Sequence, residues 1–368
     1  MKHPLHIISF DVPYPADYGG VIDVFNRLKA LHKSGFLIFL HCFDYGRGKQ
    51  TELERYTEKT YYYKRKSKTL NLLKKEPMIV ASRKSAKLLQ NLLQQEGPIL
   101  FEGQHTTALL NHPRLKNRKK IVRLHNIEHE YYEGLSNTVG FGYKKSYFKS
   151  EAKKLRKHEH VLMHANALLC IHPDDVKYYS KTHKKVKLLP PIFSFEKTNY
   201  SPGQGDFILF HGNLSVGENS EAVQWLLDNV ASQTEVKIVF AGKNPSNDLK
   251  KAVRKYSHCK IIANPDKNEL DELLNKAKAH LLITFRPSGV KLKLLQSLST
   301  SSPVICNSDL VSGTLLKDYC TIANTAKDVL TAIHSVEELS EEAFTERRDF
   351  IQHHYSPEKH AKVIADLI

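Results

Sequence analysis

The sequence predicts an α/β protein with two Rossmann-like domains, each built on a doubly wound parallel sheet. The chain has 368 residues, which favours two domains at roughly 100–200 residues per domain. In both halves, short apolar runs alternate with segments of helical periodicity, a pattern typical of parallel sheets covered on both faces. A cluster of prolines and glycines separates the two series.

The first half opens with a predicted β-α-β unit. Leu5–Phe10 is a strand, Gly19–Gly20 starts a helix that ends at Gly35, and Phe36–Phe43 is the next strand. Later strands are expected at Pro98–Glu102, Lys120–His125, Ala167–Ile171 and Val186–Leu189, with helices around Ser82–Gln95 and Lys144–Met163.

The second half repeats the alternation after the breaker cluster. Its strands are expected at Phe207–Gly212, Val236–Gly242, Cys259–Asn264, His280–Phe285 and Pro303–Cys306, with helices between them. We therefore expect an N-terminal domain over residues 1–190, a linker over 191–205 and a C-terminal domain over 206–356. The last helix, about 357–368, is expected to pack back on the first domain. Ligands of such sheets bind beyond the carboxyl ends of the strands, so two domains facing each other would form a cleft there.

Composition excludes several classes of protein. With 41% apolar residues, 26% charged residues and a mean hydropathy of −0.42, the chain is neither disordered nor fibrous. No apolar run reaches the roughly 18 residues of a membrane span, and the N-terminus lacks the apolar region of a secretory signal, so a cytoplasmic protein is expected. Five scattered cysteines without CxxC spacing indicate neither a disulfide framework nor a zinc cluster.

The basic residues are concentrated in the first half. The chain carries 55 Lys and Arg against 39 Asp and Glu, a net charge of +16. Residues 1–200 hold 36 basic and 18 acidic side chains, whereas residues 201–368 hold 19 and 21. Such a field attracts polyanions, anionic lipid surfaces or phosphorylated substrates, and by itself it does not choose among them.

The sharpest local signal runs from Phe285 to Gln296, where a strand end, a glycine-bearing loop and a helix start follow one another. Unpaired amides at a helix N-terminus attract phosphate, and Lys291 adds a positive charge, so a diphosphate could bind there. A plain strand-to-helix turn with a solvated lysine pair explains the same residues. Glycines and polar residues after other strands of this half, including Gly212 and Lys243, point to the same sheet edge.

Three stretches together resemble family four glycosyltransferases of the GT-B fold over nearly the full length. They are the strand, Pro-Tyr-Pro and Gly19–Gly20 helix start, the segment Arg123–Glu128, and Gly289–Gln296. The resemblance implies two Rossmann-like domains facing across a cleft, with the donor in the second domain and the acceptor in the first. It also implies transfer of a hexose from a UDP- or GDP-sugar to a saccharide or lipid-linked saccharide. The transfer would retain anomeric configuration and need no metal or other cofactor.

The resemblance assigns roles to individual residues. Gly19 and Gly20 would lie beside the donor phosphates and sugar, and His125 would contact the transferred sugar near the reacting centre. Gly289, Val290, Lys291 and Lys293 match a GIKxK pattern that faces the sugar and diphosphate. Lys243 and Arg286 would help to neutralise the leaving diphosphate, and Gly212 belongs to the donor site. His125 and Lys291 are the catalytic candidates.

The chain departs from the family at its paired glutamates. The E-x7-E positions hold Ser288 and Gln296. Gln296 keeps one carbonyl acceptor for ribose hydroxyls but loses the charge, and Ser288 can still hydrogen-bond a sugar hydroxyl. A basic residue usual after the first C-terminal strand is also missing between His211 and Asn219. A degenerate protein that binds nucleotide sugar without turnover is therefore an alternative, as is a related epimerase or phosphorylase.

The remaining signals leave alternatives open. His125 and His129 have the i, i+4 spacing of zinc proteases but lack the glutamate directly after the first histidine. Two segments, residues 61–96 and 141–160, are rich in basic residues, and the first interleaves them with apolar ones, Tyr61, Tyr62, Tyr63, Leu70, Leu72, Leu73 and Met78. This mixture suits peripheral contact with an anionic membrane, although a solvated basic face explains it equally. A nucleic-acid-binding protein is the competing interpretation of the charge, but no nucleic-acid-binding module pattern is visible, so no nucleic-acid partner is expected.

Overall fold

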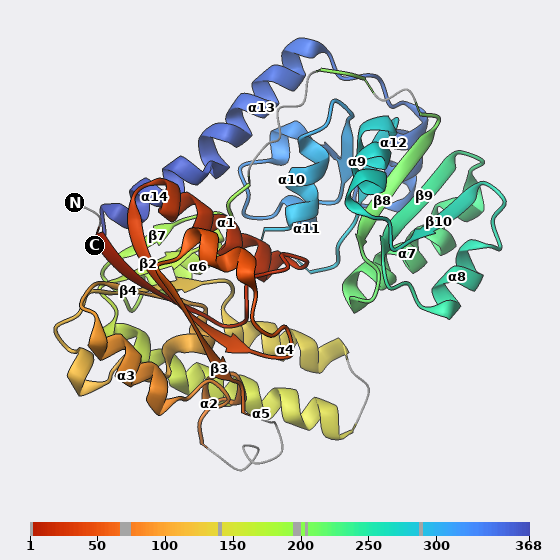
Figure 1. Cartoon of the computed structure of the whole chain (residues 1–368). Helices are drawn as coiled ribbons and strands as arrows, with labels where there is room; N and C mark the ends of the chain where they lie inside the picture. Colours follow the sequence, from red (N-terminus) through yellow and green to blue (C-terminus); the bar gives the residue numbers. More distant parts are fainter. Residues whose placement is uncertain (1–2, 67–74, 139–141, 194–199, 203–204, 287–289) are drawn as a thin grey trace. The chain divides into compact units, whose positions relative to one another are not determined.

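The computed structural model describes residues 3–66, 75–138, 142–193, 200–202, 205–286 and 290–368 (Figure 1). The chain divides into two compact units. Unit 1 comprises Met1–Ser194 and Tyr355–Ile368, and unit 2 comprises Phe195–His354. Because the chain returns to unit 1 at its end, the last helix belongs to the first unit.

Unit 1 is built on a sheet of seven parallel strands in the order β3-β2-β1-β4-β5-β6-β7. The strands are β1 (His3–Ser9), β2 (Phe36–Asp44), β3 (Lys59–Lys64), β4 (Ile99–Glu102), β5 (Lys120–Leu124), β6 (Ala167–Cys170) and β7 (Val186–Leu188). The order runs outward in both directions from the pair β1 and β4, so the carboxyl ends of β1, β4 and β5 are neighbours at one edge of the sheet. In a doubly wound sheet this edge is where ligands bind.

Both faces of this sheet are apolar, because successive side chains of a strand point to opposite faces. Leu5 and Ile7 belong to one core cluster and Ile8 to the other. The first face is covered by α1 and by the last helix, α14, which contributes Ala361 and Ile364. The second face is covered by α3, η4 and α6. The unit is therefore a sheet between two helical layers.

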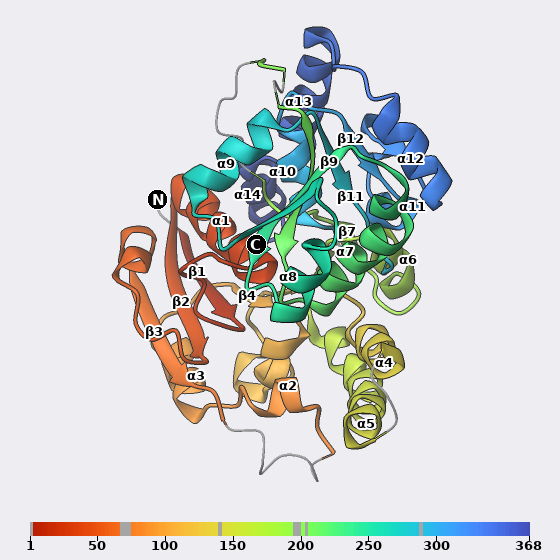
Figure 2. The ribbon, with the colours of Figure 1, turned by 90° about the vertical axis from the view of Figure 1, so that its right-hand side faces the viewer.

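The helices of unit 1 are α1 (Gly19–Lys33), α2 (Met78–Ala81), α3 (Ala86–Gln94), α4 (Glu128–Thr138), α5 (Tyr143–His158), α6 (Pro173–Tyr179) and α14 (Pro357–Ala365), with the 3-10 turns η1 (Thr51–Tyr56), η2 (Gln104–Leu109), η3 (Pro113–Leu115) and η4 (Glu159–His164). Helices α4 and α5 lie side by side as a pair (Figure 2). Helix α1 ends as predicted, since Gly35 has a φ of +87° and donates its amide to the carbonyl of His32.

Unit 2 has a second parallel sheet, of six strands in the order β10-β9-β8-β11-β12-β13. The strands are β8 (Phe207–Asn213), β9 (Lys237–Lys243), β10 (Cys259–Ala263), β11 (Ala279–Leu282), β12 (Val304–Cys306) and β13 (Thr321–Ile322). One face packs against α7, α8 and α12, and the other against α9. The second Rossmann-like unit thus has the same layered plan.

The helices of unit 2 are α7 (Gly217–Asn229), α8 (Asn247–Val253), α9 (Lys267–Lys276), α10 (Leu292–Leu298), α11 (Ser308–Val311), α12 (Ala326–His334) and α13 (Glu341–Tyr355), with the 3-10 turns η5 (Ala231–Gln233) and η6 (Lys317–Tyr319). Two parallel α/β sheets are therefore present, which confirms the predicted fold class. Within the described ranges, no helix has both the length and the apolar character needed to span a bilayer.

Two local expectations need correction. The helix expected from Ser82 begins at Ala86, where the Ser85 hydroxyl accepts a hydrogen bond from the amide of Leu88 and so caps it. The aromatic part of the predicted membrane segment is the edge strand β3, in which Tyr63 is buried and hydrogen-bonded to His41 and Asn91. Met78 is also buried. Leu70, Leu72 and Leu73 lie outside the described residues.

Candidate functional site

Basic and polar side chains gather at one edge of the unit 2 sheet. Lys291 directly precedes α10, and its Nζ lies 3.0 Å from Oε1 of Glu218 in the first turn of α7. Glu218 also accepts a hydrogen bond from the hydroxyl of Thr284, which follows β11. Burial raises the pKa of Glu218, but Lys291 and the Thr284 hydrogen bond outweigh it and hold this pKa below its ordinary value. Glu218 is therefore a carboxylate that neutralises Lys291.

Lys293 is the second lysine of this edge and is half-buried. Its Nζ donates to Oδ1 of Asn219, 2.8 Å away, and lies 4.8 Å from the centre of the Phe210 ring. Burial lowers the pKa of the Lys293 ammonium to about 8, against the opposing attraction of Glu218. A lysine with this pKa carries most of its positive charge at neutral pH and loses it in mildly alkaline solution.

The other predicted donor-site residues lie around this cluster. Arg286 follows β11 with its Nη2 3.5 Å from Oε2 of Glu221, and Lys243 is exposed at the end of β9. Val290 is half-buried before α10, and Gln296 is half-buried within it. Ser288 and Gly289 lie outside the described residues, so their predicted roles stay predictions.

Gly212 has a packing reason to be glycine. It lies at the end of β8 opposite Gly242 of β9, with a φ of +157°. A Cβ on Gly212 would lie 3.1 Å from Nδ2 of Asn219, and a Cβ on Gly242 would lie 1.7 Å from the Gly212 carbonyl oxygen. The two glycines allow β8, β9 and α7 to approach closely, and this sets the position of Asn219 beside Lys293.

Sequence reasoning missed Glu218 and Thr284. A carboxylate two residues into a helix ordinarily indicates favourable interaction with the helix dipole rather than an ion pair with a distant lysine. Glu218 and Lys291 are 73 positions apart, and only the neighbouring places of β8 and β11 in the sheet bring them together. The one available signal was that each follows a predicted strand of the same sheet.

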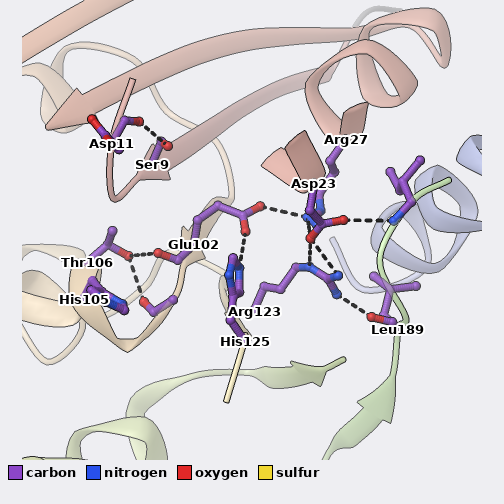
Figure 3. Close-up of polar contacts among 12 residues, drawn as sticks. Ser9, Asp11, Asp23, Arg27, Glu102, His105, Thr106, Arg123, His125 and Leu189 are labelled. Atoms are coloured by element: carbon purple, nitrogen blue, oxygen red, sulfur yellow. Dashed lines mark hydrogen bonds and ion pairs between the residues drawn. The ribbon is translucent and has the colours of Figure 1, made fainter. Parts of the chain in front are cut away.

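In unit 1, His125 follows β5 and is held by a buried carboxylate. Its Nε2 lies 3.2 Å from Oε2 of Glu102, the last residue of β4 (Figure 3). Burial raises the pKa of Glu102, but Arg27 and the hydrogen bond with His125 dominate and keep it below its ordinary value. Since an ionised carboxylate only accepts hydrogen bonds, Nε2 of His125 carries the proton of this contact, and in the neutral tautomer that fits it Nδ1 has the lone pair.

A buried ion network continues from Glu102. Arg27 of α1 joins Glu102, 3.3 Å away, to Asp23 one helical turn earlier. Arg123 of β5 donates two hydrogen bonds to Asp23, at 3.1 and 2.9 Å, and a third to the carbonyl of Leu189 (Figure 3). The two arginines oppose burial and hold the pKa of Asp23 below its ordinary value. Two positive and two negative side chains thus balance one another in the core next to His125.

Gly19 and Gly20 begin α1 next to the end of β1. A Cβ on Gly20 would lie 2.9 Å from Cζ of Phe10, whose ring packs edge-on against His125 with centroids 5.4 Å apart. Glycine at position 20 therefore makes room for Phe10 and, through it, for His125. The expected role of both glycines at a donor phosphate stays a prediction.

The histidines at positions 125 and 129 do not share a ligand site. His125 contacts Glu102, whereas Nδ1 of His129 lies 2.6 Å from Oε1 of Glu159 in η4. Among the described residues, no group of three or more His, Cys, Asp or Glu side chains is arranged to hold a metal ion. The zinc-protease alternative therefore has no support from these two histidines.

Known proteins are similar to this chain in sequence and in fold. Residues 205–342, nearly the whole of unit 2, match the family described as Glycosyl transferases group 1. An uncharacterized 44.6 kDa protein in the cps region of Klebsiella pneumoniae is 28% identical over 378 residues, covering 96% of each chain. The matched residues include both Glu218 and Lys291.

Solved structures extend the likeness to the full length. HepE of Anabaena in complex with UDP superposes with a TM-score of 0.69 at 12% identity, covering 100% of this chain and 99% of HepE. TarM superposes with a TM-score of 0.72 at 11% identity, and a glycosyltransferase of Rickettsia africae with 0.69 at 11%. TarM is covered to 99% and the Rickettsia protein to 97%, each over 100% of this chain. The chain has the GT-B fold of glycosyltransferases.

Proposed function

We propose that this protein is a glycosyltransferase that moves a hexose from a nucleotide-diphosphate sugar to a saccharide or lipid-linked saccharide acceptor. Its donor is a UDP-sugar, a choice supported by the UDP complex of HepE. The reaction retains anomeric configuration and uses no metal, as the resemblance to family four implies. The observation that carries the proposal is the cluster of Lys291, Lys293 and Arg286 at the carboxyl edge of the unit 2 sheet, within the matched glycosyl transferase domain.

The cluster suits the charge that develops when a sugar leaves a nucleoside diphosphate. Breaking that bond places negative charge on the diphosphate oxygens, and fixed cations stabilise it most effectively in a partly buried site. Lys291, directly before α10, and Lys293, in its first turn, provide two such cations. A diphosphate that binds Lys291 competes with Glu218, so donor binding exchanges one anion for another at the same ammonium group.

His125 has a different task, which its hydrogen bond defines. With Nε2–H directed to Glu102, the ring presents the Nδ1 lone pair, which accepts a hydrogen bond from a sugar hydroxyl. The role follows the family resemblance, in which this histidine contacts the transferred sugar. In a retaining reaction without a covalent intermediate, the acceptor hydroxyl attacks the anomeric carbon as the bond to phosphate breaks, and its proton passes to the leaving phosphate.

The acceptor is part of a growing polysaccharide or its lipid-linked precursor. The cps-region location of the Klebsiella protein supports this assignment. We place the reaction in the cytoplasm. We also propose that unit 1 contacts a membrane surface there, because α5 exposes Tyr143, Lys144, Lys149 and Arg156. Flotation with phosphatidylglycerol vesicles tests this contact: salt-sensitive binding is expected, and equal recovery with neutral phosphatidylcholine vesicles would contradict it.

A second candidate is a protein that binds nucleotide sugar without turnover. It is favoured by Ser288 and Gln296 in place of the family's glutamates and by the carboxylate of Glu218 beside Lys291. The two functions separate in one assay, the release of UDP from UDP-glucose in the absence of acceptor. An enzyme releases UDP slowly, and Lys291→Ala strongly reduces the rate of release. Binding of UDP-glucose without any release of UDP would favour the second candidate. A thermal-shift panel of UDP-, GDP- and ADP-sugars identifies the nucleotide, because a ligand of the native state raises the melting temperature.

A further inference from the structure

A second histidine of unit 1, His105, packs against Phe10, the ring that also contacts His125. His105 belongs to η2, which follows β4, and its ring centre is 5.6 Å from that of Phe10. The centre of the His125 ring is 5.4 Å from the same phenyl group. Strands β4 and β5 are neighbours, so both imidazoles lie at the carboxyl edge of the unit 1 sheet (Figure 3). Of these two histidines, the resemblance to glycosyltransferases assigned a role only to His125.

Each of these histidines has a buried glutamate beside it, but the two pairs differ in charge. Glu102, next to His125, is also paired with Arg27. Glu128, next to His105, is 2% exposed and begins α4, and its Oε1 lies 3.8 Å from Nδ1 of His105. Both of these atoms are buried and have no hydrogen-bond partner among the described residues.

Two unpaired buried polar atoms that face each other are unfavourable, since each costs about 1–3 kcal/mol when it lacks a partner. At 3.8 Å they are too far apart for a direct hydrogen bond but close enough to form one after a shift of about 1 Å. The local backbone favours this contact. Gly103 has a φ of +75°, and a Cβ there would lie 2.9 Å from Nδ1 of His105, so glycine leaves room for the imidazole.

Protonation states agree with such a pair. Burial raises the pKa of Glu128 to about 7, opposed by a hydrogen bond from Asn126 and by the charge of Arg83, while Asp175 adds to the rise. Burial and nearby Arg83 hold the pKa of His105 well below its ordinary value. A neutral Glu128 donates its O–H to Nδ1 of a neutral His105, which places the remaining ring proton on Nε2. The His105 side chain is 24% exposed although Nδ1 is buried, so the ring remains accessible to a ligand.

We propose that His105, held by Glu128, binds a hydroxyl group of the acceptor saccharide through Nε2, next to the Phe10 ring that also contacts His125. This inference rests on the proposed function, because it assigns the acceptor to the unit that carries His125. The ligand class is a sugar hydroxyl. Glu128 is a positioning residue, because it acts on the ligand only through the His105 ring.

The test detects binding directly and needs no turnover. The full chain is labelled with ¹⁵N at histidine, and the His105 resonances are assigned by their loss in His105→Gln. Methyl α-glucoside, methyl α-galactoside and methyl α-mannoside are then titrated in turn. At least one is expected to shift the His105 resonances while leaving those of exposed His160 unchanged. Glu128→Gln, which keeps the shape of the side chain but lacks the acidic O–H, is expected to weaken this binding about five- to tenfold.

Controls separate this inference from the proposed function. Glu130→Gln removes an exposed carboxylate from the same helix and should bind the glycosides as the wild type does. If Glu128→Gln fails to fold, His105→Gln serves instead, and calorimetry should show that it loses glycoside binding while its melting temperature is unchanged. UDP-glucose binding is measured on the same samples: its absence in the wild type counts against the proposed function alone. No shift with any glycoside, equal shifts at His105 and His160, or wild-type binding by the Glu128 variant would overturn the inference.

Discussion

Charged side chains at the sheet edges of the two units are paired in different ways. In unit 1, Asp23, Arg27, Glu102 and Arg123 neutralise one another inside the core, and His125 is attached to this network. In unit 2, Lys291 has a carboxylate partner, Glu218, and both side chains keep close to a fifth of their surface exposed. The comparison teaches that groups that position a ring are fixed by permanent partners. In the proposed donor site, Lys291 instead has a partner, Glu218, that a bound anion would displace.

The largest effect is expected from breaking the permanent network. Asp23→Asn removes the carboxylate that the buried side chains of Arg27 and Arg123 share. It should lower the free energy of unfolding by about 3–5 kcal/mol. Urea denaturation measures this loss. The control is Lys33→Ala, on the same helix α1 as Asp23. It removes an exposed ion pair with Glu358 of α14 and should leave the free energy of unfolding unchanged within error. Equal effects of the two substitutions would contradict the contrast.

Removing the exchangeable cation should affect catalysis rather than stability. Lys291→Ala is expected to reduce the rate of UDP release from UDP-glucose about 10²–10³-fold, the range for loss of one group that stabilises developing negative charge. The melting temperature should change little, because the Lys291 side chain is partly exposed. Lys251→Ala, in exposed α8 of the same unit, is the matched control and should retain the wild-type rate. An unchanged rate in Lys291→Ala would remove this lysine from the donor site.

The pH dependence of UDP binding should follow Lys293. Its folded-state pKa is about 8, so the ammonium charge that attracts the diphosphate is present below pH 8 and is lost as the pH rises through that value. Affinity for UDP should therefore fall about tenfold between pH 7 and pH 9. Lys293→Gln should bind more weakly at pH 7 and show a flat profile over this range. Calorimetry at several pH values checks both expectations. An equally steep profile in Lys293→Gln would show that another group causes the pH dependence of UDP affinity.

The smallest expected effect tests displacement at Lys291. Glu218→Gln removes the carboxylate that competes with a diphosphate and should raise the affinity for UDP about two- to tenfold, since a partly exposed ion pair is worth about 1 kcal/mol or less. Glu221 lies on the same helix and contacts half-buried Arg286, so Glu221→Gln provides the comparison and should have a smaller effect. Weaker UDP binding in Glu218→Gln would show that the carboxylate contributes to the site instead of competing for it.

The sheets could be predicted because their pattern is local. Apolar runs such as Leu5–Phe10 and Phe36–Phe43 become β1 and β2, and Gly35 between them ends α1 with the expected positive φ. Strand β3 was missed because Tyr61–Tyr63 stand next to a run of lysines and arginine, so the composition favoured a surface segment. In the core, Tyr63 hydrogen-bonds His41 of the neighbouring strand β2, a contact that exists only once the sheet has formed.

The candidate site was predictable in type but not in its partners. Strand-end position and residue chemistry pointed to Lys291, and the family resemblance pointed to His125 and Lys293. Their contacts join residues far apart in the chain, as with Asp23 and Arg123, which are 100 positions apart. No periodicity encodes such a pair, because it depends on the order of strands in the sheet. The same reason explains why Glu128 and His105 were not expected to meet.

Isothermal titration of UDP-glucose into the wild type and Lys291→Ala tests the central claim most directly. The claim is that unit 2 binds a nucleotide-diphosphate sugar through an ammonium group that Glu218 otherwise neutralises. The account predicts saturable binding by the wild type, a loss of at least about tenfold in the variant, and weaker binding of UDP-glucose at higher salt. Identical binding by the two proteins, or no heat of binding from UDP-glucose with either, would contradict it.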